Sequence, residues 1–417
     1  MMGHVQDRWY RVEPDPSDPR KTIRVPTNRH GSGRRYKARL VGPDGGEVSQ
    51  TFADGQLKLA RDWLARQEVD KALGTFVDPR AGKVTIAAFA ERWLADLDVD
   101  EMSREHLEMR FTSRILPDLG RLELASVTPS VIRGWDRRLR ESGLSERYRL
   151  TLFTNLAALF TAAQDDGLIA KNPFRGKSVK KPRPPKEKVV PWPEGQVWAV
   201  QSALPDRFSV LVDLAASLGL RQGECFGLAV EDVDFLRGVV RVRRQVKTVR
   251  HKRIFALPKY DKEREVPLPE PVKLALAAHL RAFPSHEITL PWDVPAGKPV
   301  TARLVATSAW GHAIAANDFN RNYWKPALTA NGIPCGRYEN GMHELRHFFA
   351  SVLLEQGVSI KAVAEWLGHT DPAFTLATYT HLMPSSDERT RLAIATVYER
   401  RASSDGPTTA QAGPAGE

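Results

Sequence analysis

The chain has 417 residues, of which 42% are hydrophobic, and this length and composition predict two or three domains with packed cores. Its net charge of +11 favours a polyanionic partner, and its two cysteines, Cys225 and Cys335, exclude a disulfide framework and fit a reducing cytoplasm. A polar N-terminus argues against a signal peptide, and no apolar run approaches the roughly 18 residues of a membrane span.

Residues 1–75 have the pattern of a small module of strands and one helix. Runs of apolar and β-branched residues predict three short strands, at Trp9–Val12, Tyr36–Val41 and Val48–Phe52. A helix is expected from Gln56 to Leu73. Eight Lys and Arg residues and no acidic residue lie between Arg20 and Arg39, so this module has either a solvated basic loop or a sheet that contacts DNA.

Residues 84–175 have the periodicity of helices throughout. The predicted helices are Val84–Leu97, one that Thr128 and Pro129 open as cap and first position, and Glu146–Asp165. Leu116–Gly120 is expected to break the helical run. The pattern predicts a bundle of four or five helices.

Residues 176–189 are predicted to be a basic linker. The stretch Arg175–Lys188 holds seven basic residues, one acidic residue and three prolines, so we expect it to stay extended and unpacked. Its charge would suit a phosphate backbone.

Residues 190–400 predict a mixed α+β domain. A helix at Phe208–Leu218 leads through Gly-Leu-Arg-Gln-Gly-Glu at 219–224 into a second helix. Strands are expected at Val239–Val246 and Glu265–Leu268, and a helix at Asn317–Leu328. Eleven Lys and Arg residues against two acids lie between Arg237 and Arg264, a run that is either a solvated face or a nucleic-acid surface. Residues 401–417, rich in Ala, Gly, Pro and Ser, are expected to be disordered.

Three short helices are predicted between His343 and Tyr379. The first ends at Gly357, the second runs from its cap Ser359 to Gly368, and the third opens with Asp371 and Pro372. His343 and Arg346 lie three residues apart and therefore share a helical face, where an imidazole and a guanidinium suit a phosphate. The phenol of Tyr379 can act as a nucleophile toward phosphorus.

The order of these groups resembles the C-terminal box of the tyrosine recombinase (phage integrase) family. His343-x-x-Arg346 is followed after 23 residues by His369 in Leu-Gly-His, and ten residues later by Tyr379. The upstream box G-L-R-x-G-E is intact at 219–224, with Cys225 where an aliphatic residue is more usual. A lysine seven residues before the Val of Val-Pro-Leu selects Lys259 over Lys252 and Lys262.

The resemblance implies a multidomain fold, mainly α with small β-sheets. The N-terminal three-stranded sheet plus helix, with the connector Gly74–Gly82, is similar to the arm-type DNA-binding domains of phage integrases. Residues 84–175 are similar to a helical, SAM-like core-binding domain, and residues 190–400 to the mixed α+β catalytic domain.

The implied activity is that of a site-specific DNA recombinase, or integrase, for a phage or mobile element. Such an enzyme cleaves and rejoins DNA through a 3′-phosphotyrosyl intermediate without a cofactor or metal. The resemblance assigns Tyr379 as the nucleophile, His343 as its proton acceptor and Lys259 as the proton donor to the leaving 5′ oxygen. Arg221, Arg346 and His369 would stabilise charge on the phosphate, and Glu224 would support a neighbouring side chain. The expected partners are double-stranded DNA attachment sites, a homotetramer on DNA, and an accessory DNA-bending or directionality factor, with no membrane.

Three alternatives stay open at this stage. The chain could be a catalytically silent DNA-binding regulator, which the complete set of six site residues argues against. Type IB topoisomerases have similar chemistry, but the N-terminal module favours integration. His343-Glu344-Leu345-Arg346-His347 also matches the zinc-peptidase motif H-E-x-x-H, with Glu365 as a third ligand. The extended zinc motif, however, needs Gly and His where this chain has Ala350 and Leu353.

Overall fold

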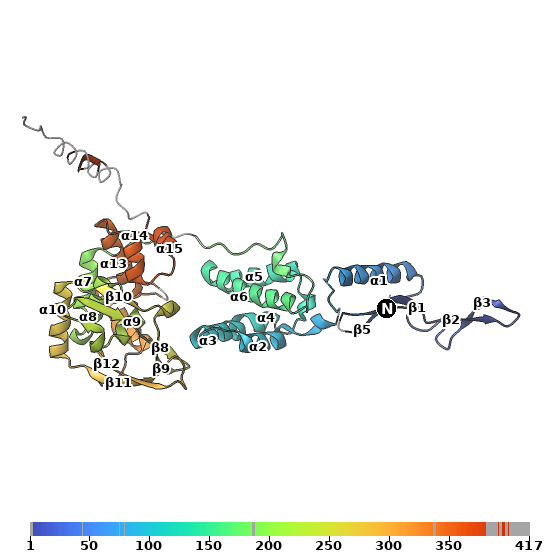
Figure 1. The fold of residues 1–417 in the computed structure, drawn as a ribbon, viewed down its shortest axis with the longest axis horizontal. Helices are drawn as coiled ribbons and strands as arrows, with labels where there is room; N and C mark the ends of the chain where they lie inside the picture. The colour runs from blue at the N-terminus through green and yellow to red at the C-terminus, as the bar shows by residue number, and fades with distance from the viewer. Residues whose placement is uncertain are drawn as a thin grey trace, which may run out of the picture. The chain divides into compact units, whose positions relative to one another are not determined.

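The computed structural model describes residues 3–43, 45–74, 76–78, 80–185, 188–336 and 339–380, together with 391, 394–396 and 399. The chain divides into two compact units, Met1–Pro185 and Lys186–Glu417. They run from blue to green and from green to red in Figure 1. Helices predominate and the sheets are small and antiparallel, which confirms the predicted fold class. The predicted disordered tail, 401–417, lies outside the described residues.

The first unit begins with a three-stranded antiparallel sheet of order β1-β4-β5 whose face is covered by helix α1. Among the described strands, β2 and β3 pair only with each other and form a separate hairpin. The elements are β1 (His4–Asp7), β2 (Tyr10–Asp15), β3 (Asp18–Pro26), β4 (Tyr36–Val41), β5 (Glu47–Phe52) and α1 (Leu57–Ala72). A small core of Tyr36, Ala38, Leu40, Phe52, Ala60 and Leu64 joins the sheet to α1.

The predicted strand at Trp9–Val12 overlaps β2, but β2 belongs to the hairpin, and β1 is the third strand of the sheet instead. A charged contact explains the pairing of β1 with β4. Arg35, just before β4, donates to Asp7 at 2.9 Å and to Asp54 at 2.9 Å. The rings of Trp9 and Tyr10 lie 5.7 and 5.0 Å from the same guanidinium, which directs the chain away from the sheet and into the hairpin.

A helical bundle completes the first unit. Its helices are α2 (Ile86–Asp96), α3 (Glu101–Arg110), α4 (Leu116–Leu119), α5 (Pro129–Glu141) and α6 (Glu146–Asp165). A separate core forms between them around the fully buried Trp135, Phe111 and Phe160. The predicted cap and start of α5 at Thr128 and Pro129 are confirmed. The predicted break at Leu116–Gly120 is confirmed only at the end of that segment, because the helical run continues to Leu119 and stops at Gly120. A π-helical turn leads into α4, and Pro117 fits there because it occupies the first turn, where no partner for its nitrogen is needed.

The basic linker differs in one respect from expectation. It has no helix or strand between Lys177 and Pro185, as predicted. Val179, however, packs on the bundle core, Pro182 is buried, and the Arg183 amide donates to Glu146 at 3.1 Å. The prediction that this segment stays unpacked is wrong, because two apolar side chains among the charges suffice to dock it.

The second unit has one large core that α8 crosses, with sheets and helices around it. Its helices are α7 (Glu194–Ser202), α8 (Asp206–Leu218), α9 (Gln222–Gly227), α10 (Glu270–Ala282), α11 (Ala316–Phe319), α12 (Lys325–Ala330), α13 (His343–Glu355), α14 (Ile360–Leu367) and α15 (Pro372–Tyr379). Its strands are β6 (Val233–Asp234), β7 (Val239–Val242), β8 (Gln245–Val249), β9 (Lys252–Ala256), β10 (Arg264–Pro267), β11 (His286–Pro291) and β12 (Pro299–Leu304).

The strand predicted at Val239–Val246 is divided into β7, which pairs with β6 and β10, and β8, which pairs with β9. The division falls at Arg243 and Arg244, whose guanidiniums approach the buried carboxylate of Asp232 to 2.8 and 2.5 Å. Both side chains must reach one carboxylate, and the alternation of a regular strand would point them to opposite faces. The β11–β12 hairpin was not predicted.

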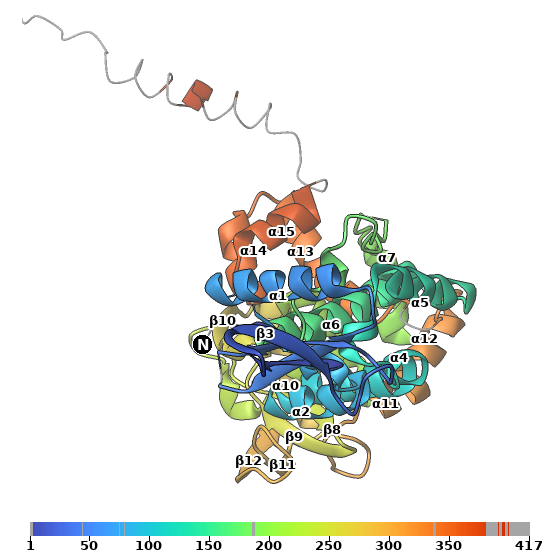
Figure 2. The same ribbon diagram turned by 90° about the vertical axis from the view of Figure 1, so that its right-hand side faces the viewer.

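The three C-terminal helices agree with the sequence prediction. Ser359 caps α14 through a bond from the Ala362 amide at 3.2 Å, and Asp371 caps α15 through the Ala373 amide at 2.8 Å. Gly368 ends α14 with φ of 65°, in the left-handed region. Figures 1 and 2 both show α13, α14 and α15 gathered at one end of the second unit.

Within the residues described, no helix is both long enough and apolar enough to cross a membrane.

Candidate active site

The site begins where α8 ends. Gly219 adopts φ of 63° and reverses the chain, so that Arg221 stands at the start of α9. A Cβ at Gly219 would lie 2.5 Å from the Phe349 ring of α13, so only glycine allows this close approach. The Gly219 carbonyl in turn accepts a hydrogen bond from the Arg346 guanidinium at 2.6 Å. The G-L-R-x-G-E box and α13 are thereby joined.

Glu224 is the acidic centre of the site and is 1% exposed. It accepts from Arg221 at 2.8 Å and from both terminal nitrogens of Arg264, at 3.1 and 2.6 Å. Burial alone would raise the pKa of this carboxyl, but the charges of Arg264, Arg221 and Arg346 outweigh it and hold the pKa at about 2. Glu224 is therefore ionised and balances a cluster of three guanidiniums.

Arg346 occupies the middle of this cluster and is 1% exposed. Besides Gly219, its guanidinium donates to the Leu367 carbonyl and, at 3.1 Å, to Nε2 of His369. Burial and the neighbouring Arg221 lower its pKa, and Glu224 opposes them. The contacts fix the guanidinium plane, so it is oriented before any anion arrives.

His369 follows the left-handed Gly368 and is held at both ring nitrogens. Nε2 accepts from Arg346, and Nδ1 lies 2.7 Å from the hydroxyl of the fully buried Thr375 on α15. Burial, then the charges of Arg346 and Arg221, lower the pKa of His369 to about 3. The imidazole is therefore neutral near pH 7.

Tyr379, the last residue of α15, is 2% exposed. Its hydroxyl lies 2.6 Å from Nδ1 of His347, one turn beyond His343 on α13. Burial raises the pKa of this phenol to about 12, although the charge of Arg346 favours its ionised form. The phenol is thus protonated and is hydrogen-bonded to a histidine of its own chain.

His343 and Lys259 lie at the margin of the site. The exposed His343 ring meets His347 edge to face, with ring centroids 4.6 Å apart. The surrounding protein and the charges of His347, Arg346, Arg221 and Lys259 all lower the pKa of His343. Lys259 is exposed on the turn after β9, where Tyr260 has a left-handed φ of 68°. Its charge acts on His343 through space without a direct contact between them.

The structure thus brings Arg221, His343, Arg346, His369 and Tyr379 together, and Lys259 lies within electrostatic reach. The sequence interpretation missed Arg264 and the contact of His347 with Tyr379. Arg264 could have been identified from the alternation in β10, since it shares a face with the buried Val266. The H-E-x-x-H motif gives His347 only the role of a zinc ligand.

Among the described residues, no group of three or more His, Cys, Asp or Glu side chains could hold a metal ion. The contacts of His347 with Tyr379, and of His343 with His347, account for the two histidines of the H-E-x-x-H motif.

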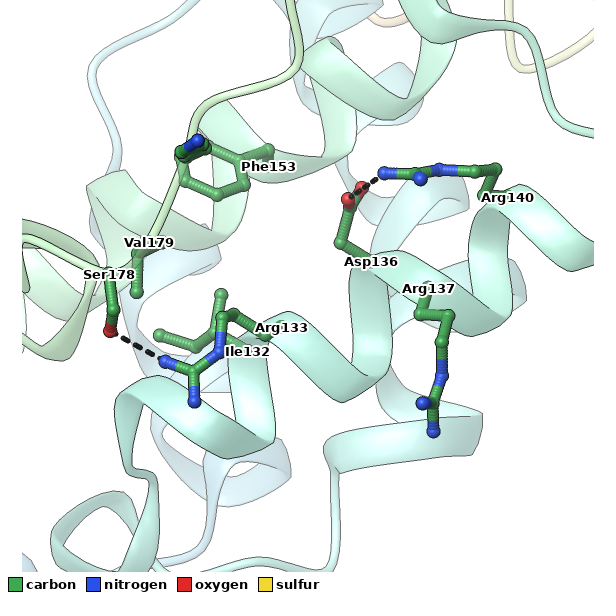
Figure 3. Close-up of a pocket in the computed structure, with 9 residues that line it drawn as sticks. Ile132, Arg133, Asp136, Arg137, Arg140, Phe153, Ser178 and Val179 are labelled. Carbon is green, nitrogen blue, oxygen red and sulfur yellow. Dashed lines mark hydrogen bonds and ion pairs between the residues drawn. The ribbon is translucent and has the colours of Figure 1, made fainter.

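A second candidate surface lies in the first unit, between α5 and the linker (Figure 3). This open pocket of about 310 Å³ is lined by Ile132, Arg133, Asp136, Arg137, Arg140, Phe153, Ser178, Val179 and Lys180. Arg133 donates to the Ser178 hydroxyl at 2.6 Å, and Arg140 pairs with Asp136 at 3.5 Å. Four basic residues against one acidic residue make it a candidate contact for a phosphate backbone. We call it the α5 basic pocket.

The chain is similar to several known proteins. Residues 199–386 match the model of the phage integrase family. A tyrosine recombinase XerC-like protein of Caldanaerobacter subterraneus is 30% identical over 322 residues, covering 72% of this chain and 80% of that protein. The integrase of Mycobacterium phage L5 is 24% identical over 358 residues, covering 82% and 90%.

Solved structures show the same fold. The Tn1549 transposon integrase, in complex with a circular-intermediate DNA, has a TM-score of 0.61 at 22% identity and covers 75% of this chain and 99% of that one. A lambda integrase tetramer bound to a Holliday junction has a TM-score of 0.54 at 15% identity, covering 84% and 93%.

Proposed function

Because the chain belongs to the tyrosine recombinases of the phage integrase family, we propose that it cuts and rejoins double-stranded DNA at specific sites through Tyr379. One observation carries this proposal. The phenol of Tyr379 lies in a site with two buried or half-buried guanidiniums, Arg221 and Arg346, and the neutral imidazole of His369. A phosphodiester is an anion, and its attack by a phenol needs such cations. Neither the silent regulator nor the zinc peptidase accounts for this arrangement.

Arg221 and Arg346 would bind the non-bridging oxygens of the scissile phosphate. Their orientation is set by Glu224 and by main-chain carbonyls, so little reorganisation is needed as charge builds up on phosphorus. His369 would add a hydrogen bond from Nε2 once an oxygen replaces Arg346 as its partner. Its proton would then move from Nδ1 to Nε2, and the Thr375 hydroxyl would donate to Nδ1.

The reaction would form a bond from the Tyr379 oxygen to phosphorus and break the bond to the 5′ oxygen. Lys259 would protonate this leaving oxygen, since its exposed position on a turn lets it move toward the DNA. A 5′ hydroxyl of the partner strand would reverse the step, so the bond energy is kept in the phosphotyrosine. The proton acceptor of Tyr379, assigned from the sequence to His343, has a second candidate in His347.

The division of labour follows the sequence boundaries. Residues 1–75 would bind arm-type sites, residues 84–175 and the linker 176–189 would bind the core site, and residues 190–400 would carry out the chemistry. The separate cores of the N-terminal module and the helical bundle support this division. By analogy with the lambda integrase tetramer, four protomers would assemble on two duplexes. An accessory DNA-bending or directionality factor would be a further partner in the integration or excision of the element.

Substitution of Tyr379 by Phe tests the function. The substrate is selected from a pool of randomised, nicked duplexes, by capture of DNA that stays attached to the wild-type protein after denaturation. Tyr379→Phe removes one oxygen and keeps the ring, so DNA binding should be retained and the covalent adduct should disappear. An adduct of undiminished yield with the Phe variant would exclude Tyr379 as the nucleophile.

A further inference from the structure

His347 is the one described residue whose side chain makes a hydrogen bond to the Tyr379 hydroxyl. The Nδ1 to Oη distance is 2.6 Å, and the two ring centroids are 5.7 Å apart. No hydrogen bond joins His343 to Tyr379 among the described residues, although the sequence assigned His343 to this role. The contact links α13 to α15, so it depends on the fold of both helices.

The direction of the hydrogen bond follows from burial. The phenol is 2% exposed, and His347 is the partner available to it among the described residues. If His347 donated from Nδ1, the phenol proton would be buried without an acceptor, at a cost of about 1–3 kcal/mol. Tyr379 therefore donates, and the unprotonated nitrogen of His347 is Nδ1.

The imidazole is suited to this role by its surroundings. Burial, followed by the charge of Arg346, lowers the pKa of His347 to about 4, so the ring is neutral and its Nδ1 lone pair is free to accept. The charged or titratable groups that face this contact are His343 and Arg346 on α13 and Tyr379 on α15, with Glu344 acting on the phenol. A phosphodiester bound by the guanidiniums would add a negative charge here, which favours protonation of His347.

Resting on the proposed function, we propose that His347 is a further catalytic residue, which receives the Tyr379 proton at Nδ1 as the phenol oxygen attacks phosphorus. In this step the O–P bond to Tyr379 forms and the P–O5′ bond breaks. One proton passes from the phenol to His347, and one passes from Lys259 to the 5′ oxygen, so the charge of the protein–DNA complex is unchanged. His343, at the margin of the site, is left to contact the phosphate or the DNA.

The test separates the proton acceptor from the proton donor. The cleavable duplex selected with the wild-type protein is synthesised with oxygen or with sulfur at the bridging 5′ position. A thiolate leaves without a proton, so the sulfur substrate needs an acceptor at Tyr379 and no donor at the leaving group. The variant is His347→Asn, whose side chain can still accept a hydrogen bond near the position of Nδ1 and cannot take a proton. The matched control is His312→Asn, an exposed histidine of the same unit.

His347→Asn should cleave both substrates more slowly by the same factor, about 100- to 10,000-fold for the loss of a general base. The cleavage rate of His347→Asn should rise with pH, because hydroxide then accepts the Tyr379 proton in place of the imidazole. Lys259→Ala should cleave the oxygen substrate slowly and should cleave the sulfur substrate at close to the wild-type rate. His312→Asn should match the wild type. A wild-type rate for His347→Asn, or a loss that sulfur repairs, would overturn the assignment.

A second measurement is independent of cleavage. Nitrogen-15 spectra of the full chain without DNA should show His347 with an unprotonated Nδ1 and a protonated Nε2, and Tyr379→Phe should shift the Nδ1 signal. The opposite tautomer would contradict the proposal even if the protein is an active recombinase. Failure of the wild type to form any adduct would instead contradict the proposed function, so the two hypotheses fail by different results.

Discussion

At the scale of single residues, the negative charge of the Glu224 carboxylate allows three guanidiniums to share a buried site. Glu224 contacts Arg221 and Arg264 directly, and its charge also acts on Arg346. The two ion pairs with Glu224 have different roles. Arg264 is buried, and its third nitrogen, Nε, donates to the Trp366 carbonyl, which makes it structural. Arg221 keeps 18% of its side chain exposed and can still reach a ligand.

Glu224→Gln should destabilise the second unit strongly, because it leaves three cations without a counter-charge. Breaking a buried pair in this way costs about 3 kcal/mol. The measurement is urea denaturation of the full chain, followed by tryptophan fluorescence, to which the stacked Trp192 and Trp324 of this unit contribute. The matched control is Glu265→Gln, whose side chain is 48% exposed and pairs with Arg241 at 3.0 Å. The control should cost less than about 1 kcal/mol. Equal costs would contradict the central role of Glu224.

Acid should begin to destabilise the second unit at about pH 6.5, before most carboxylates titrate. His347 and His369 have folded pKa values of about 4 and about 3, against about 6.5 in an unfolded chain. Below the unfolded value the unfolded state binds more protons, so stability is full above pH 6.5 and falls as the pH drops toward 3. Denaturation midpoints measured across this range should fall less steeply for His369→Asn. Parallel profiles for the variant and the wild type would contradict the burial of a neutral His369.

At the scale of elements, local signals predicted the helices of the site well. Ser359, Asp371 and Gly368 act within one helical turn, and their caps are found where the sequence places them. The failures involve partners distant in sequence. Arg243 breaks a strand because Asp232 lies in another element, and His347 contacts Tyr379 across 32 residues. No local pattern encodes such contacts, so the candidate site residues could be named from the sequence while their pairing could not.

The turn at Gly219 gives a prediction with an internal control. Gly219 and Gly332 both follow helices with left-handed φ values, 63° and 67°. A Cβ at Gly219 meets Phe349 at 2.5 Å, and at Gly332 it meets nothing within 4 Å. Gly332→Ala should cost about 1 kcal/mol of backbone strain. Gly219→Ala should add about 1–3 kcal/mol of overpacking and also impair cleavage, since Gly219 holds Arg346.

Thermal melting and adduct yield of the two variants provide the comparison. Similar melting temperatures would show that α13 can move away from the turn without cost. An unimpaired adduct in a destabilised Gly219→Ala variant would show that the carbonyl contact to Arg346 is dispensable.

At the scale of the whole molecule, the charge of +11 is distributed unevenly. Several of the basic side chains are already paired with acidic side chains of the same protein. Arg35 is paired with two acids, and Arg243 and Arg244 share Asp232. The α5 basic pocket differs, because Lys180 is exposed and Arg133 contacts only a serine hydroxyl among the side chains that line it. Net charge alone therefore overstates the surface that can meet DNA.

Replacing Arg133 and Lys180 together by Ala should reduce the salt dependence of DNA binding. Each lost phosphate contact flattens the log–log slope of affinity against salt by about 0.9. Sequence preference should change little, because phosphate contacts carry no base information. The control replaces Lys273 and Arg281 on α10, which removes the same charge from the other unit. An equal change of slope in both variants would show that the loss of net charge, and not a phosphate contact at the pocket, changes the salt dependence.

The bond between His347 and Tyr379 has a consequence for how defective subunits behave in mixtures. In the proposed reaction the nucleophile and the catalytic cluster belong to one polypeptide, because Tyr379 is hydrogen-bonded to His347 of its own chain, so each subunit would carry a complete cleavage site. A chain lacking the Tyr379 hydroxyl and a chain lacking the Arg346 guanidinium should therefore not complement each other when combined on one DNA. Restored cleavage in the mixture would mean that α15 leaves its own chain and serves a neighbour. If the mixture does not cleave the DNA, each protomer uses only its own side chains, and a loss-of-function mutation disables only the subunit that carries it.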